Sequence, residues 1–196
     1  DGETGVAIGL ALNDFNNITK AYIGNEASIN QNVAQNAAGV NPSIVVSATN
    51  TTNITSLSGT LGVALDGTGV GAGFEIGIID NETWAYIGNE ATVDAESDIS
   101  ITATSMEDPT TATINAGVGD DAGVAGALIV YVITTDTLAW VGNEADIESS
   151  AGNVSVKADG TLEIVGFAGA VGVGINSVGF GASFLTIVHN DTVQAW

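Results

Sequence analysis

One motif that recurs along the chain constrains the fold more than any other feature. It reads Thr-Trp-Ala-Tyr-Ile-Gly-Asn-Glu-Ala-Thr-Val at 83–93, and close copies occupy 19–29 and 137–147. Residues 194–196 match the start of a fourth copy, so we expect the chain to be a segment of a longer array. A fixed repeat indicates a tandem-repeat architecture and takes precedence over a domain count based on length.

The spacing of equivalent residues sets the repeating unit. Trp140 follows Tyr86 by 54 positions, and Trp196 follows Trp140 by 56 positions. The step from Tyr22 to Tyr86 is longer, at 64 positions, whereas the steps from Ile44 to Ile99 and from Ile99 to Val154 are both 55, which places an insertion loop at 30–43. Such a loop is tolerated in one repeat because it extends away from the stack. We predict a single repeat array with units of approximately 1–66, 67–120, 121–175 and a partial 176–196.

The local pattern within each unit is typical of β-strands. Val, Ile and Thr dominate, and apolar residues alternate, as at Ile99, Ile101 and Ala103. Strands that recur at a fixed distance predict an all-β fold, a parallel β-helix (β-solenoid) in which each coil packs on the next. Three coils of about 18 residues or two of about 27 both fit one unit. An antiparallel β-sheet or barrel is the alternative.

The Gly-Asn-Glu sequence of each motif is expected to form a corner, with Gly or Asn at positive φ. Equivalent residues of successive coils would then stack along the axis. We therefore predict an aromatic ladder of Tyr22, Tyr86, Trp140 and Trp196.

Composition excludes several classes of function. The net charge is −21, and the only basic residues apart from one histidine are Lys20 and Lys157, so we expect no nucleic-acid partner. The chain has no cysteine, so neither disulfides nor thiolate metal sites stabilise the fold. The uncharged run 164–188 is long enough to span a bilayer, but its many glycines disfavour a helix, and we expect no transmembrane helix.

The sequence carries little that indicates catalysis, and we predict that the chain is not an enzyme. His189 is the only histidine and has no cysteine or basic residue near it in sequence. Asp80 with Glu82, or Asp120 with Asp121, could be read as the carboxylate pair of a glycosidase. β-Helical enzymes of that kind normally also need cations, so we interpret these acids as solvated turn residues.

Calcium is the one cofactor that the pattern allows. Asp94, Glu96 and Asp98 alternate just before a strand, and oxygen ligands from turns suit Ca²⁺. Only Glu148 remains of this triplet in the next unit.

Six Asn-x-Ser/Thr sequons make asparagines candidate glycosylation sites. They are Asn17, Asn50, Asn53, Asn81, Asn153 and Asn190. Three of them precede the recurring motif, so repeated turn chemistry explains them as well as modification does.

The order N-x-T-x-A-Y-I-G-N-x-A-x-V followed by I-x-I-x-A, at 81–104 and in its copies, resembles the repeats of very large bacterial surface adhesins. These are the filamentous-haemagglutinin-like and leukotoxin-like proteins, which have long β-helical stalks. The resemblance covers essentially the whole chain and implies an extracellular or cell-surface location. The head of trimeric autotransporters also uses Ala-Ile-Gly repeats, but the repeat unit of this chain is much longer than theirs.

We therefore expect a structural repeat segment of an extracellular fibre or giant surface adhesin, a stiff acidic rod for cell-surface attachment or filament assembly. Its expected partners are neighbouring repeats, copies of itself end to end, and host or cell-surface glycans or proteins. The alternative is a β-helical carbohydrate-binding or carbohydrate-active module.

Overall fold

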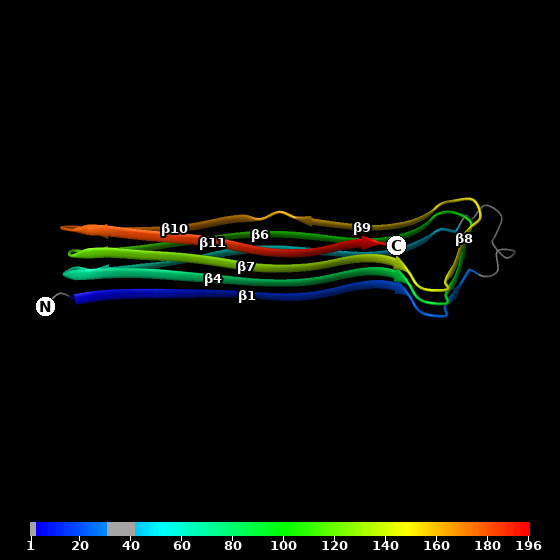
Figure 1. Cartoon of the computed structure of the whole chain (residues 1–196), viewed down its shortest axis with the longest axis horizontal. Coiled ribbons are helices and arrows are strands. Elements are labelled where there is room, and N and C mark those ends of the chain that lie inside the picture. The colour runs from blue at the N-terminus through cyan, green and yellow to red at the C-terminus, as the bar shows by residue number, and fades with distance from the viewer. Residues whose placement is uncertain (1–2, 31–41) are drawn as a thin grey trace.

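The computed structural model describes residues 3–30 and 42–196, so most of the predicted insertion loop at 30–43 lies outside the described residues. All regular structure in the described part is β-strand (Figure 1). The strands are β1 (Glu3–Ile23), β2 (Ser28–Ile29), β3 (Ile44–Ala64), β4 (Gly67–Ile87), β5 (Thr92–Ala95), β6 (Ile99–Gly119), β7 (Ala122–Val141), β8 (Asp146–Ser149), β9 (Val154–Leu162), β10 (Val165–Gly174) and β11 (Val178–Ala195). No helix among these residues could cross a membrane, and the run 164–188 forms β10 and much of β11.

The strands form three sheets. The front sheet has the order β1-β4-β7-β11, the back sheet contains β3, β6, β9 and β10, and the short corner sheet has the order β2-β5-β8. Every strand pair in the described part of the chain is parallel. The predicted all-β parallel β-helix is confirmed, and the antiparallel alternative is wrong.

Each repeat unit makes one broad coil. Thr68 pairs with Ala122, 54 positions further on, and Ile44 pairs with Ile99, 55 positions further on. The predictions of two or three coils per unit are therefore wrong. The reason is that inward-facing and outward-facing residues alternate without interruption, so that β1, β3, β4 and β6 are each 21 residues long. One front strand, one corner and one back strand therefore use the whole unit in a single coil.

The molecule is a thin blade. A 21-residue strand at ~3.3 Å per residue is ~70 Å long, whereas four stacked coils at ~4.8 Å rise only ~19 Å. One end of the blade, the corner end, holds the corner sheet (Figure 1). At the other, the turn end, the chain reverses through 65–66, 120–121 and 175–177.

The corner half of the blade has a conventional apolar core between the sheets. Its fully enclosed members include Ile87, Val93 and Ile101, each with no exposed surface. The alternating apolar residues at Ile99, Ile101 and Ala103 belong to this core. A second cluster, formed around Ile129, Tyr131 and Ile133, fills the middle of the blade.

The turn half is packed in the opposite sense, with small residues inside and large ones outside. A Cβ added to Gly69 would overlap the carbonyl oxygen of Val118, and elsewhere in this half only small side chains such as those of Ala125 and Ala127 lie between the sheets. Large apolar side chains therefore point outwards, and Val6, Ile8 and Leu10 are 59–70% exposed.

Candidate functional site

The Gly-Asn-Glu corner is built differently from the sequence prediction. Positive φ falls on the glutamates, at 57° in Glu26, 58° in Glu90 and 58° in Glu144, so the assignment to Gly or Asn is wrong. Gly88 is needed for another reason, since a Cβ there would lie 2.6 Å from the backbone nitrogen of Asn25 in the preceding coil. The glycine thus allows close stacking of corners, and the glutamate makes the turn.

The asparagine of each corner links it to the next coil. Asn25 Oδ1 accepts a hydrogen bond from the backbone N–H of Asn89 at 3.0 Å, and Asn89 Oδ1 accepts one from Asn143 at 2.8 Å. This asparagine ladder satisfies backbone donors at a position where the strands have ended. It holds successive corners in register.

We expect Asn89→Ala to lower the free energy of unfolding by about 1 kcal/mol, because the amide of Asn143 loses its protein acceptor. Urea denaturation followed by tryptophan fluorescence would measure the change. Asn53→Ala, at an exposed position of β3, is the matched control and should alter the midpoint little. Equal effects of the two substitutions would contradict a role for the ladder.

The four aromatic residues at the end of the front strands stack in one row. Ring centroids are 5.1 Å apart for Tyr22 and Tyr86, 4.3 Å for Tyr86 and Trp140, and 5.6 Å for Trp140 and Trp196, with planes within 10°. Trp84 meets Trp140 edge-on at 6.0 Å. The ring faces inside the row cover one another, so they leave no flat platform on which a sugar could stack. The row contributes to coil stacking.

A polar cluster is sealed inside the middle of the blade. Glu75 has no exposed surface, and its carboxylate accepts hydrogen bonds from Thr111 Oγ1 at 2.5 Å, Tyr131 Oη at 3.0 Å and Ser58 Oγ at 3.3 Å. Burial raises the pKa of Tyr131, and the charge of Glu75 and their hydrogen bond raise it further. The phenol therefore stays a donor to Glu75 at neutral pH.

A second enclosed carboxylate, Glu107, lies in the same interior. It is 1% exposed and accepts hydrogen bonds from Asn81 Nδ2 at 2.9 Å and from Ser105 Oγ. Neither Glu75 nor Glu107 can reach a substrate in this fold, so both are structural. Sequence reasoning missed both, although each carries a signal: a glutamate inside an alternating strand, at a position whose neighbours two residues away face inwards.

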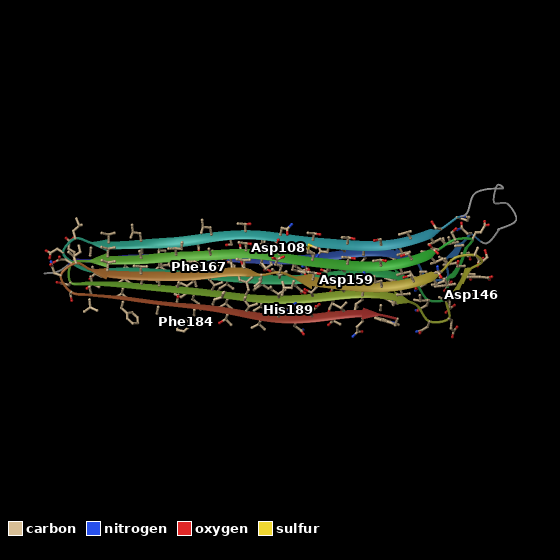
Figure 2. All side chains as sticks on the ribbon, turned by 90° about the horizontal axis from the view of Figure 1, so that it is seen from above. Asp108, Asp146, Asp159, Phe167, Phe184 and His189 are labelled. Carbon is tan, nitrogen blue, oxygen red and sulfur yellow. The ribbon has the colours of Figure 1, made fainter. Side chains whose placement is uncertain are left out.

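The acids and the histidine considered for catalysis do not form a site. Asp80 lies on the outer surface of β4, and Glu82 faces Lys20 at 3.8 Å. At the turn end, Asp120 accepts a hydrogen bond from Asn176 Nδ2 at 2.6 Å. His189 is exposed on β11, near the middle of the blade and away from these turns (Figure 2).

The predicted calcium triplet is not assembled. In the part of the chain that the structure describes, no three acidic or histidine side chains lie close enough to hold a metal ion. Asp98 instead accepts a hydrogen bond from the backbone N–H of Asn153 at 2.8 Å, as a rung between coils. Asp94 lies beside Glu148 in the register of the corner sheet, in a small depression that Ala95 and Ser150 complete.

Burial divides the six sequon asparagines into two groups. Asn81 has no exposed surface and Asn50 only 8%, so a glycan fits at neither in the folded protein. Asn17 points inwards too and donates to Asn81 Oδ1 at 3.0 Å. The exposed members are Asn53, Asn153 and Asn190.

Comparisons with family models, with curated proteins and with solved structures found no match to this chain.

Proposed function

We propose that the chain is a structural repeat segment of an extracellular fibre or giant surface adhesin. The observation that carries the proposal is the register. β1, β4 and β7 each pair over almost their whole length with the equivalent strand one unit further on, and residues of the same type meet, as with Thr19, Thr83 and Thr137. A repeat that stacks on itself in this way extends the same structure for as long as the sequence continues.

The number of coils per unit determines the shape of the proposed rod. One repeat unit adds a single coil, hence only ~4.8 Å of length, to a blade ~70 Å wide. On the order of 15 units are needed before the stack is longer than it is wide. The proposed rod is therefore a broad, flat ribbon that uses many residues for each ångström of length.

The corner glutamates suit this role because they recur at the same position in successive coils. Glu26, Glu90 and Glu144 are exposed and lie above one another at the corner end. Repulsion between acidic ribbons disfavours collapse of one onto another in dilute salt. The alternative, a carbohydrate-binding or carbohydrate-active module, has no observation that favours it here.

Lengthening the array tests the architecture of the fibre. Extra copies of 67–120, inserted after Asp120, should each extend the particle by ~4.8 Å at constant width, measured by small-angle scattering and electron microscopy. A shuffled version of the same segment is the control and should add disordered mass. Growth of ~10 Å or more per copy, the rise of two stacked coils, would contradict one coil per unit.

Labelling of intact cells with antibody tests the location separately. Exposed label is expected along filaments or the cell surface. Label found only after the cells are opened would overturn the extracellular proposal while leaving the architecture intact.

A further inference from the structure

The turn half of the front sheet presents an unpartnered apolar surface, here called the apolar face. It consists of the outward positions of 6–12 in β1, 70–78 in β4, 124–132 in β7 and 180–188 in β11. Within these positions there is no charged residue, and side chains as large as Leu10 and Phe184 are 70% and 67% exposed. A sheet face of this kind marks an interaction surface.

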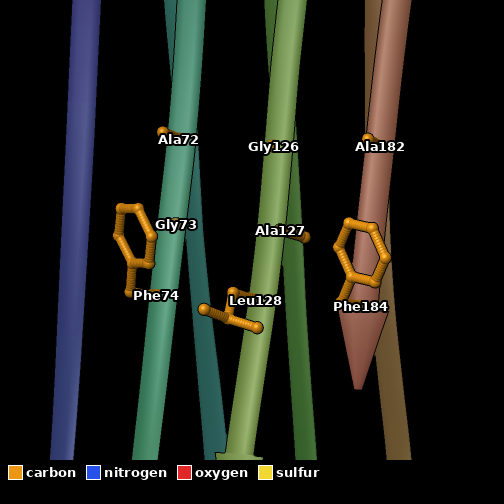
Figure 3. A pocket seen from close by; sticks show the side chains of 8 residues that line it. All are labelled: Ala72, Gly73, Phe74, Gly126, Ala127, Leu128, Ala182 and Phe184. Carbon is orange, nitrogen blue, oxygen red and sulfur yellow. The ribbon is translucent and has the colours of Figure 1, made fainter. Parts of the chain in front are cut away.

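The apolar face has relief. Ala72, Gly126 and Ala182 form a furrow that crosses the strands, while Phe74, Leu128 and Phe184 form a parallel ridge two residues away (Figure 3). The furrow is the floor of a depression of about 270 Å³ whose lining comes from both rows. On β4, β7 and β11 a ridge and a furrow therefore lie side by side, whereas on β1 the ridge continues as Leu10 and Ile8 closes the furrow.

From this relief we infer that the apolar face binds the same face of a second copy. A two-fold axis that lies in the plane of the interface, parallel to the coil axis and midway between the ridge and the furrow, places the ridge of each copy over the furrow of the other on β4, β7 and β11. It also superimposes most of the two apolar faces, because two apolar rows lie on one side of that axis, at 70 and 72 of β4, and three on the other, at 74, 76 and 78. A surface that fits itself in this way forms a closed isologous dimer.

The size of the face suits such a dimer. About 9 residues at ~3.3 Å by four strands at ~4.8 Å give ~570 Å² per copy, or ~1,100 Å² in total, just above the ~1,000 Å² that a specific interface should exceed. The thick corner halves then project in opposite directions, so most acids stay in solvent.

Charge favours a second copy over a lipid surface. Asp66 and Asp121 are exposed at the turn end, where the blade would have to enter a bilayer. The net charge of −21 opposes approach to anionic membranes and also to a second copy, so the dimer is expected where salt screens the acids. The dimer goes beyond the proposed fibre, since it needs only this face and no particular location.

Two substitutions test the interface from opposite sides. Leu128→Asp puts a carboxylate on the ridge, and Gly126→Phe fills the furrow, where an added Cβ has open space in the monomer. Both should raise the dissociation constant of the dimer at least ~100-fold, because one buries an unpaired charge and the other blocks the ridge. Ile114→Asp, at a 55% exposed position on the outer surface of the back sheet, is the matched control and should leave the dimer intact.

Sedimentation velocity over a concentration series in ~0.5 M salt, which screens the acids, gives the readout. Circular dichroism confirms that each variant is folded. A dimer lost only in the two front-sheet variants supports the inference. A wild-type chain that is monomeric at all concentrations, or a dimer lost in Ile114→Asp alone, overturns it. Binding of a monomer to neutral phosphatidylcholine vesicles, abolished by Leu128→Asp, also overturns it and identifies a lipid surface.

The absence of native cysteine allows a direct test of the two-fold geometry. The axis places position 126 of one copy opposite position 128 of the other. A mixture of Gly126→Cys and Leu128→Cys chains should therefore crosslink through a short bifunctional maleimide faster than either variant alone. Faster crosslinking within either variant alone would contradict this axis.

Discussion

Gly117→Ala is expected to cost about 3 kcal/mol of unfolding free energy or more, although it adds only one methyl group. Gly117 lies on the inner side of β6, where the front and back sheets touch. The new Cβ would overlap the carbonyl oxygen of Val124 and would lie 2.7 Å from that of Gly69. Both neighbours are backbone atoms of β-strands, so the clash can be relieved only by separating the sheets.

Gly126→Ala is the matched control, since it makes the same change on the next strand with the Cβ directed outwards. Nothing lies within 4 Å of that added atom in a single chain, so the free energy of unfolding of the monomer should change by no more than about 0.5 kcal/mol. Urea denaturation of both variants gives the comparison. A small effect of Gly117→Ala would show that the sheets are farther apart than the structure places them.

The repeat made the fold class accessible from the sequence. Residues of a motif that recurs along the chain are expected to occupy equivalent positions, and alternating Val, Ile and Thr favour strands over helices. The equivalence of the repeats and the strand assignment can both be read directly from the residue pattern. Both agree with the parallel register of Tyr22 with Tyr86 and of Ile44 with Ile99.

The number of coils in each repeat unit could not be predicted from the sequence. The repeat length gives the number of residues in a unit, and it does not say how many coils those residues form. The direction of the side chains in the turn half was also hidden. In Val6-Ala7-Ile8-Gly9-Leu10 the usual rule would bury the larger residues, yet the larger ones are exposed and the smaller ones face the back sheet. Alternation of large and small residues identifies two faces without saying which is inside. The close approach of the sheets, a tertiary property, decides it.

The corner and the interior acids show the same limit. Gly-Asn-Glu signals a turn, but the positive φ lies on Glu90 because Gly88 and Asn89 are committed to contacts with the preceding coil. Glu75 and Glu107 become buried acceptors for hydroxyl and amide groups only when front and back strands face each other. These partners are 36 and 26 residues away in sequence.

Glu75→Ala is expected to lower the free energy of unfolding by about 3 kcal/mol, while Glu75→Gln should stay within about 1 kcal/mol of the wild-type chain. Alanine leaves a cavity and removes the acceptor of Thr111 and Tyr131, whose hydroxyl groups are enclosed with it. Glutamine keeps an acceptor oxygen and nearly the same volume, and it removes a charge whose burial is itself costly. Hydrogen bonding and packing, rather than the charge, are then the stabilising contributions of this side chain.

Glu82→Ala is the control for this prediction, because it removes the same side chain from the outer face of the same strand. Glu82 is partly exposed and lies 3.8 Å from Lys20, so its loss should cost no more than about 1 kcal/mol. Urea denaturation at neutral pH compares the three variants. A Glu75→Gln protein as unstable as Glu75→Ala would mean that the interior requires the carboxylate itself, and the polar cluster would then have to be treated as a charged site held inside the blade.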